Sequence, residues 1–276
     1  MSDESTDKQL RLLVGLVVVT ALVCFGWSLT ALKPLPPVLA IYPAVLIALI
    51  GVANGLAVQI RLRAQLRLIS STSAAVVVTI AMVPLPWAVL CTAAGVLAAK
   101  ILTQRDARKI SFNTAKDVIG VTVAAGVMKL TGIDPTTPAA DPGLTVTDLG
   151  PSLLTLVPAL CVAFVGYGLV DELLGSLVIA TASRTTWGQM LRKEWDARIL
   201  SRASSLFLGI LTVIVIGQDR RLLIAMPPAV WALHLSSANR LRRRAEREAW
   251  RRLAQTTDEL NVIELDAVLR CAVTRA

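Results

Sequence analysis

Residues 12–32 read LLVGLVVVTALVCFGWSLTAL, an apolar run with no charged residue. About 20 apolar residues are needed for a helix to cross a hydrocarbon core of about 30 Å, so this run is long enough to span a membrane. The preceding stretch, MSDESTDKQLR, is rich in acidic residues, whereas secretory signal peptides begin with a basic region. We therefore expect a short tail at 1–11 followed by a retained first membrane span.

The rest of the chain has the same character. Hydrophobic residues make up 55% of the 276 residues and charged residues only 17%, which is too apolar for a soluble domain of this length. The apolar runs lack the alternation of barrel strands, so the sequence predicts an all-α, polytopic transmembrane helix bundle over 12–238. Proline, glycine and charge clusters divide it into about eight crossings, with six or seven as alternatives: 12–32, 38–60, 68–83, 87–103, 112–130, 151–180, 203–217 and 221–238.

Basic residues in the short loops predict the orientation of the bundle, because cytoplasmic loops are enriched in lysine and arginine. The segment 131–150 contains three aspartates and no basic residue, as expected of an outward loop. Both termini are then predicted to be cytoplasmic. Two places fit this assignment poorly: VPLPW at 83–87 makes the third and fourth crossings short, as in a hairpin, and Arg220 and Arg221 would lie outside. The predicted cytoplasmic loops contain Arg61, Arg63, Arg67, Arg105, Arg108, Lys109, Arg184, Arg192, Lys193, Arg198 and Arg202.

Five polar residues within the apolar region are candidates for an intramembrane switch: Asn113, Lys116, Asp117, Asp171 and Glu172. Counting along the helices places Lys116 and the two acids of the sixth run at similar depth, so we expect Lys116 to pair with Asp171 or Glu172. Ionisable groups at membrane depth are costly and often functional, as ligand sites or proton-sensitive switches. The structural alternative is that Lys116 extends to the interface while the acids meet lipid headgroups or basic loops.

Gly51 and Gly55 have the GxxxG spacing of closely packed membrane helices, either within one chain or between two copies in a homodimer.

Catalytic and cofactor motifs are missing from the sequence. It contains no HExxH, CxxC, GxSxG or GxxxxGK[ST] pattern, and its single histidine leaves little material for metal or nucleophile chemistry. Adjacent residues such as Asp171 and Glu172 point to different sides of a helix, which makes them a poor acid–base pair. We expect no enzymatic activity, no metal and no cofactor.

The C-terminal segment is strongly basic. No glycine or proline follows Pro228, so the last membrane helix can continue as a juxtamembrane helix over 239–257. Basic residues in such a juxtamembrane helix are attracted to the anionic inner leaflet by about 1 kcal/mol each. Nucleic-acid binding is not expected, because the segment starts at the bilayer. Its basic residues are Arg240, Arg242, Arg243, Arg244, Arg247, Arg251 and Arg252.

The last segment, 258–276, has an amphipathic face without a partner in the sequence, which suggests contact with another domain or protein. The stretches ISFNTAKDVIGVTVAAGV (110–127), LLGSLVIATASRTTWGQMLRKEW (173–195) and 227–273 together resemble the N-terminal multi-pass sensory region of bacterial signalling proteins. In that family the region precedes a GAF domain and a GGDEF or HD-GYP output domain of cyclic di-GMP metabolism. The final segment resembles the start of the GAF domain.

The resemblance implies a sensory or anchoring module of the bacterial plasma membrane that relays a signal to a cytoplasmic output domain or partner. No GAF body, GGDEF sequence or HD pair occurs in the sequence, so we expect the membrane module of a longer protein or a shortened relative. The main alternative is a transporter or channel component, which the proline-interrupted runs and intramembrane charges would also suit.

Overall fold

A computed structural model of the chain describes residues 2–35, 37, 40–55, 58–62, 65–69, 72–132, 149–183, 185–192, 195–219 and 221–232. The described part is predominantly helical, as the sequence predicts. Two compact units are distinguished, 1–231 and 232–276, and nearly all of the second lies outside the described residues. The predicted juxtamembrane helix and its seven arginines, like the amphipathic segment after Asp258, therefore also lie outside them.

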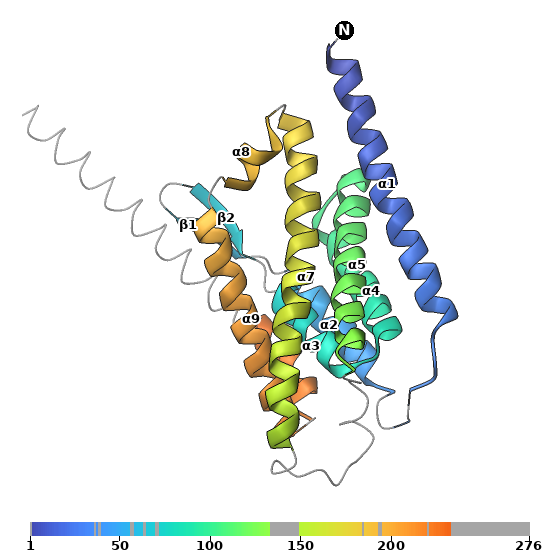
Figure 1. Cartoon of the computed structure of the whole chain (residues 1–276), viewed down its shortest axis with the longest axis vertical. Coiled ribbons are helices and arrows are strands. Elements are labelled where there is room, and N and C mark those ends of the chain that lie inside the picture. The colour runs from blue at the N-terminus through green and yellow to red at the C-terminus, as the bar shows by residue number, and fades with distance from the viewer. Residues whose placement is uncertain are drawn as a thin grey trace, which may run out of the picture. The chain divides into compact units, whose positions relative to one another are not determined.

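The elements follow one another along the chain with short connections between most of the helices (Figure 1). In order, they are α1 (Ser2–Thr30), α2 (Tyr42–Gly55), β1 (Val58–Leu62), β2 (Gln65–Ile69), α3 (Thr72–Met82), α4 (Leu85–Thr103), α5 (Ala107–Leu130), α7 (Leu149–Ser183), α8 (Trp187–Arg192), α9 (Trp195–Gln218) and a further helix, Leu222–Ala232.

Several polar groups of the helices are satisfied locally, as an apolar environment favours. The Asp106 carboxylate caps α5 by accepting a hydrogen bond from the Arg108 amide at 2.9 Å. The hydroxyls of Thr79 and Thr122 donate to the carbonyl oxygens of Ala75 and Val118, four residues earlier, each at 2.8 Å. An apolar helix can carry such hydroxyls without leaving a donor unpaired.

Close helix packing at glycine forms the α2–α4 contact within the chain. A Cβ atom on Gly95 of α4 would lie 2.8 Å from the Ile47 carbonyl oxygen and 2.9 Å from the Ile50 Cβ, so the missing side chain lets the backbones approach. A Cβ on Gly51 would meet the Gly95 carbonyl oxygen, and one on Gly55 would meet the Ala99 Cβ. The GxxxG spacing is thus used in intrachain packing, the first of its two predicted uses.

Three described helical stretches are long and apolar enough to cross a membrane: Asp7–Thr30, Leu85–Thr103 and Thr155–Ser183. The prediction of about eight crossings is not supported. Four apolar helices, Tyr42–Gly55, Thr72–Met82, Ser201–Gly217 and Leu222–Ala232, have only 10–17 residues, and 17 residues rise only about 26 Å. The 24-residue helix α5 is not among the three candidate spans; it includes Lys116 and Asp117.

The boundaries of two predicted crossings also need correction, because a β-hairpin lies between α2 and α3. Strands β1 and β2 pair antiparallel, with Val58 opposite Ile69 and Leu62 opposite Gln65. The runs predicted at 38–60 and 68–83 therefore contribute residues to the hairpin as well as to helices. A short antiparallel strand and the end of a helix can have the same continuous apolar pattern, so that pattern alone does not distinguish them.

The packing of the long helices creates the setting for the polar residues. Helix α5 packs against α7, α4 and α1, while α9 packs against α3 and also contacts α7 (Figure 1). The N-terminal ends of α1 and α5 approach each other, since an Asp7 oxygen lies 3.6 Å from an Arg108 guanidinium nitrogen. At the other end of α1, the Trp87 indole donates to the Lys33 carbonyl oxygen at 2.9 Å.

Candidate functional site

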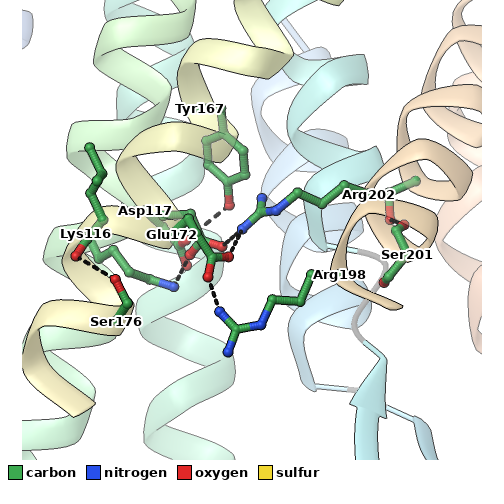
Figure 2. A network of polar contacts seen from close by, with 11 residues as sticks. Lys116, Asp117, Tyr167, Glu172, Ser176, Arg198, Ser201 and Arg202 are labelled. Carbon is green, nitrogen blue, oxygen red and sulfur yellow. Dashed lines mark hydrogen bonds and ion pairs between the residues drawn. The ribbon is translucent and has the colours of Figure 1, made fainter. Parts of the chain in front are cut away.

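Three helices bring ionisable side chains together inside this apolar bundle. We call the group of Lys116, Asp117, Asp171, Glu172, Arg198 and Arg202 the ionic cluster (Figure 2). The first two belong to α5, the two acids at 171 and 172 to α7, and the two arginines to α9. Three positive side chains thus meet three negative ones.

Asp171 is shared by two cations from different helices. Its Oδ1 accepts a hydrogen bond from the Lys116 Nζ of α5, and its Oδ2 accepts one from Arg202 Nη2 of α9 at 2.5 Å. The three side chains are only 18–25% exposed. Of the two acids predicted as partners of Lys116, Asp171 is the one with which it pairs.

Glu172 makes the second link between α7 and α9. Its Oε1 accepts a hydrogen bond from Arg198 Nη1, and its Oε2 lies 3.4 Å from Arg202 Nη2. Asp171 and Glu172, although adjacent on α7, therefore both contact α9. Their Cβ directions differ by about 100°, but α9 lies across the gap and its long arginine reaches both carboxylates.

Asp117 has a different environment from the other two acids. The residue is 6% exposed, and its Oδ1 accepts a hydrogen bond from the phenol of Tyr167 at 3.0 Å. Tyr167 is itself buried on α7 and points toward α5 in Figure 2. Lys116 and, from α4, Lys100 act on Asp117 electrostatically.

Two glycines make room for this arrangement. A Cβ on Gly120 would lie 2.7 Å from the Cδ2 of Tyr167, so the ring occupies the space that a side chain would fill. A Cβ on Gly168 would lie 3.3 Å from the Arg202 guanidinium. The sequence GYG at 166–168 therefore places an aromatic residue against α5 and leaves a path for an arginine from α9.

Tyr167, Arg198 and Arg202 belong to the site although the sequence did not predict them there. The charge of Arg198 and Arg202 predicts a cytoplasmic loop, but α9 begins at Trp195, eight residues before the predicted span, and includes both. Their spacing of four residues along a helix face was the available signal. In the structural alternative, the acids meet basic loop residues while Lys116 extends to the interface. The observed pairing of the acids with Arg198 and Arg202 is close to the first part, but Lys116 donates its hydrogen bond to Asp171.

Asn113 does not join the ionic cluster. Its amide lies 3.5 Å from the Gln104 Oε1, just before the start of α5. Asn113 therefore lies at the α4–α5 connection, whereas Lys116 and Asp117 face α7. Ser176 lies near the cluster on α7 (Figure 2). Its hydroxyl accepts a hydrogen bond from the Trp187 indole at 2.7 Å.

The chemistry available to the cluster is the exchange of ion pairs and protons. Within the described ranges, no three His, Cys, Asp or Glu side chains are grouped so that they could hold a metal ion. The cluster joins α9 to α7 and α7 to α5, so a change in the charge of one member alters contacts between helices. Its arrangement suits a conformational switch or an ion path.

No protein-family model, curated protein or solved structure matches this chain. The geometry of the ionic cluster and the composition of the helices around it are therefore the basis for a functional proposal.

Proposed function

We propose that the chain is a multi-pass membrane module that senses a condition at the membrane and relays it through α9 to its C-terminal segment. The observation that carries this proposal is the double ionic link between α7 and α9, made by Asp171 and Glu172 with Arg198 and Arg202. After α9, the chain continues through 222–232 toward the basic C-terminal residues. In this proposal, a displacement of α9 reaches that segment through the helix Leu222–Ala232.

Such a link suits a two-state element because its parts can exchange partners. Arg202 contacts both acids, and Asp171 contacts both Arg202 and Lys116. A small change at the cluster can redistribute these contacts without exposing an unpaired charge to the apolar surroundings. A stimulus that favours one distribution shifts the population of α9 positions.

The proposed setting is the bacterial plasma membrane, with both termini in the cytoplasm and arginines 240–252 on the anionic inner leaflet. The proximity of Asp7 to Arg108 supports placing the N-terminal tail on the same side as the α4–α5 connection. The C-terminal partner in this proposal is a cytoplasmic output domain, in cyclic di-GMP signalling if the chain acts as the bacterial sensory regions that its sequence resembles. We assign no catalytic activity to the chain itself.

A reporter fusion tests the relay. An output enzyme attached after Ala276 should change its activity when Glu172→Gln or Arg198→Gln loosens the α7–α9 link. Asp7→Asn is the matched control, because it removes one carboxylate that contacts exposed arginines, Arg11 on α1 and Arg108 on α5, away from the α7–α9 link. Reporter output that is the same in all four proteins, at equal membrane abundance, would contradict the relay.

Transport is the second candidate function, and the same intramembrane charges favour it. Pro84 separates the short helix α3 from α4, an interruption that also occurs beside substrate paths in transporters. Ion and solute flux in vesicles containing the purified chain separates the two functions. Flux that Asp171→Asn abolishes would favour transport, whereas no flux above protein-free vesicles is the result expected of a relay.

A further inference from the structure

Asp117 differs from the other two acids of the ionic cluster in its hydrogen-bond partner. In the part of the chain that the structure describes, Asp171 and Glu172 contact arginine or lysine directly, while the hydrogen bond to Asp117 comes from a neutral phenol. Asp117 is also more deeply buried than these two acids. A carboxylate under such conditions loses hydration without gaining a direct cationic partner.

The charged and titratable groups around Asp117 come from four helices. Its chain neighbour Lys116 directs its ammonium group to Asp171, and Lys100 of α4 acts from a distance. From α7, Tyr167 donates its hydrogen bond and Asp171 adds a second negative charge. Arg202 of α9 is engaged with the two acids of α7.

We propose that Asp117 is a reversible proton-binding site and that its ligand is a proton from the aqueous phase. The proton adds to one carboxylate oxygen to give a neutral carboxyl group and leaves by the reverse step. Burial disfavours the charged form of a carboxylate, and the adjacent Asp171 disfavours it further. Lys116 and Lys100 oppose these two effects, so both forms of Asp117 are accessible.

Proton binding to Asp117 would alter the ionic contacts between α7 and α9. With Asp117 ionised, the cluster has three anions for Lys116, Arg198 and Arg202. With Asp117 neutral, two anions remain and Lys116 loses the attraction of Asp117, so Lys116 competes more strongly with Arg202 for Asp171. The contact between α7 and α9 is weakened by this competition. This consequence rests on the proposed relay, whereas the proton site itself does not.

Infrared difference spectroscopy of the full chain in lipid vesicles tests the proton site. Between mildly alkaline and mildly acidic pH, the wild type should gain a carbonyl stretching band typical of a neutral carboxyl group in apolar surroundings. Asp117→Asn should lose this band, and the exposed control Asp7→Asn should keep it. A band that persists in Asp117→Asn, or a wild type without such a band, would overturn the proposal.

Tyr167→Phe provides a second test that does not require the Asp117 variant to fold. The phenol donates to the ionised carboxylate, so its removal makes proton binding more favourable by about tenfold or more. The band should therefore appear at a pH about one unit higher than in the wild type. An unchanged midpoint would show that Asp117 is not the group that binds the proton.

The relay is judged separately from the proton site. A fused reporter should respond to the same pH change in the wild type and lose the response in Asp117→Asn. A carboxyl band without any reporter response leaves the proton site intact and contradicts the relay. A reporter response without the band contradicts the proton site alone.

Discussion

Asp171 is the acid of the cluster that pairs with cations from two different helices, a lysine of α5 and an arginine of α9. Its partners are mostly screened from solvent, so the attraction is stronger than in an exposed pair. Loss of the carboxylate charge leaves Lys116 and Arg202 close together without the anion between them. This makes the residue a structural centre of the cluster as well as a part of the proposed relay.

Asp171→Asn should therefore destabilise the chain by about 2 to 3 kcal/mol, somewhat less than a fully buried pair would lose. Tryptophan fluorescence during thermal unfolding in lipid nanodiscs measures the effect. Asp7→Asn should cost about 0.5 kcal/mol or less, because Asp7 and its partners Arg11 and Arg108 are 44–64% exposed. Equal melting temperatures for the two variants would contradict the central role of Asp171.

For single residues, the sequence predicts which acids and bases lie in the apolar region better than it predicts how their side chains are arranged. Depth counting places Lys116 level with Asp171 and Glu172 without choosing between them, since all three lie on long regular helices whose rise per residue is fixed. Depth counting does not place Tyr167 in the cluster, because in the sequence a tyrosine within an apolar run is like any other core residue. The role of Tyr167 depends on the space above Gly120, which is a property of two packed helices.

Among the elements, α9 is held on two sides by different forces. Toward α7 the contacts are ionic, through Arg198 and Arg202. Toward α3 the contact is steric, since a Cβ on Gly209 would lie 2.8 Å from the Val77 Cβ and 3.2 Å from the Ala74 carbonyl oxygen. The steric contact fixes the distance of α9 from α3, while the ionic contacts can be redistributed.

Gly209→Ala should push α9 away from α3, because the backbone carbonyl of Ala74 cannot rotate aside as a side chain would. We expect a loss of about 1 to 3 kcal/mol in unfolding free energy. Gly175→Ala on α7 is the matched control, with nothing within 4 Å of its added Cβ. It should be neutral or stabilising by up to about 1 kcal/mol through helix propensity. If denaturation in detergent ranks the two variants the other way, α9 is not held closely against α3.

Element positions were largely predictable, and element ends were not. The apolar runs correctly marked where helices form, because few polar residues interrupt them. The hairpin at 58–69 was missed because Arg61, Arg63 and Arg67 have the charge that is typical of a loop. The start of α9 was missed for the same reason, since lysine and arginine mark interfaces in sequence but also form ion pairs inside helix bundles.

At the scale of the whole molecule, the surface of the described bundle fits an apolar environment. Large hydrophobic residues are exposed along α1, including Leu12, Leu16, Leu22 and Trp27, with others on α7 and α9. Such a surface would favour aggregation in water and is favourable against lipid. Together with the three helices long enough to span, it supports a membrane location.

The chain should accordingly remain in the membrane pellet after alkaline washing and be released by detergent. Leu16→Asp should reduce the membrane-integrated fraction, because an aspartate near the centre of a spanning helix costs about 2.5 to 3.5 kcal/mol. Leu16→Ala is the control and should remain integrated. Release of the unmodified chain by alkaline washing would show that α1, α4 and α7 do not cross the bilayer.

The ionic link between α7 and α9 is tested most directly by a double-mutant cycle in lipid nanodiscs. The cycle compares the unfolding free energies of Glu172→Gln, Arg198→Gln, the double variant and the wild type. Because Glu172 and Arg198 contact each other directly and either single change removes that contact, the double variant should cost at least about 1 kcal/mol less than the sum of the singles. Costs that add to within about 0.3 kcal/mol would contradict the link on which the proposed relay depends.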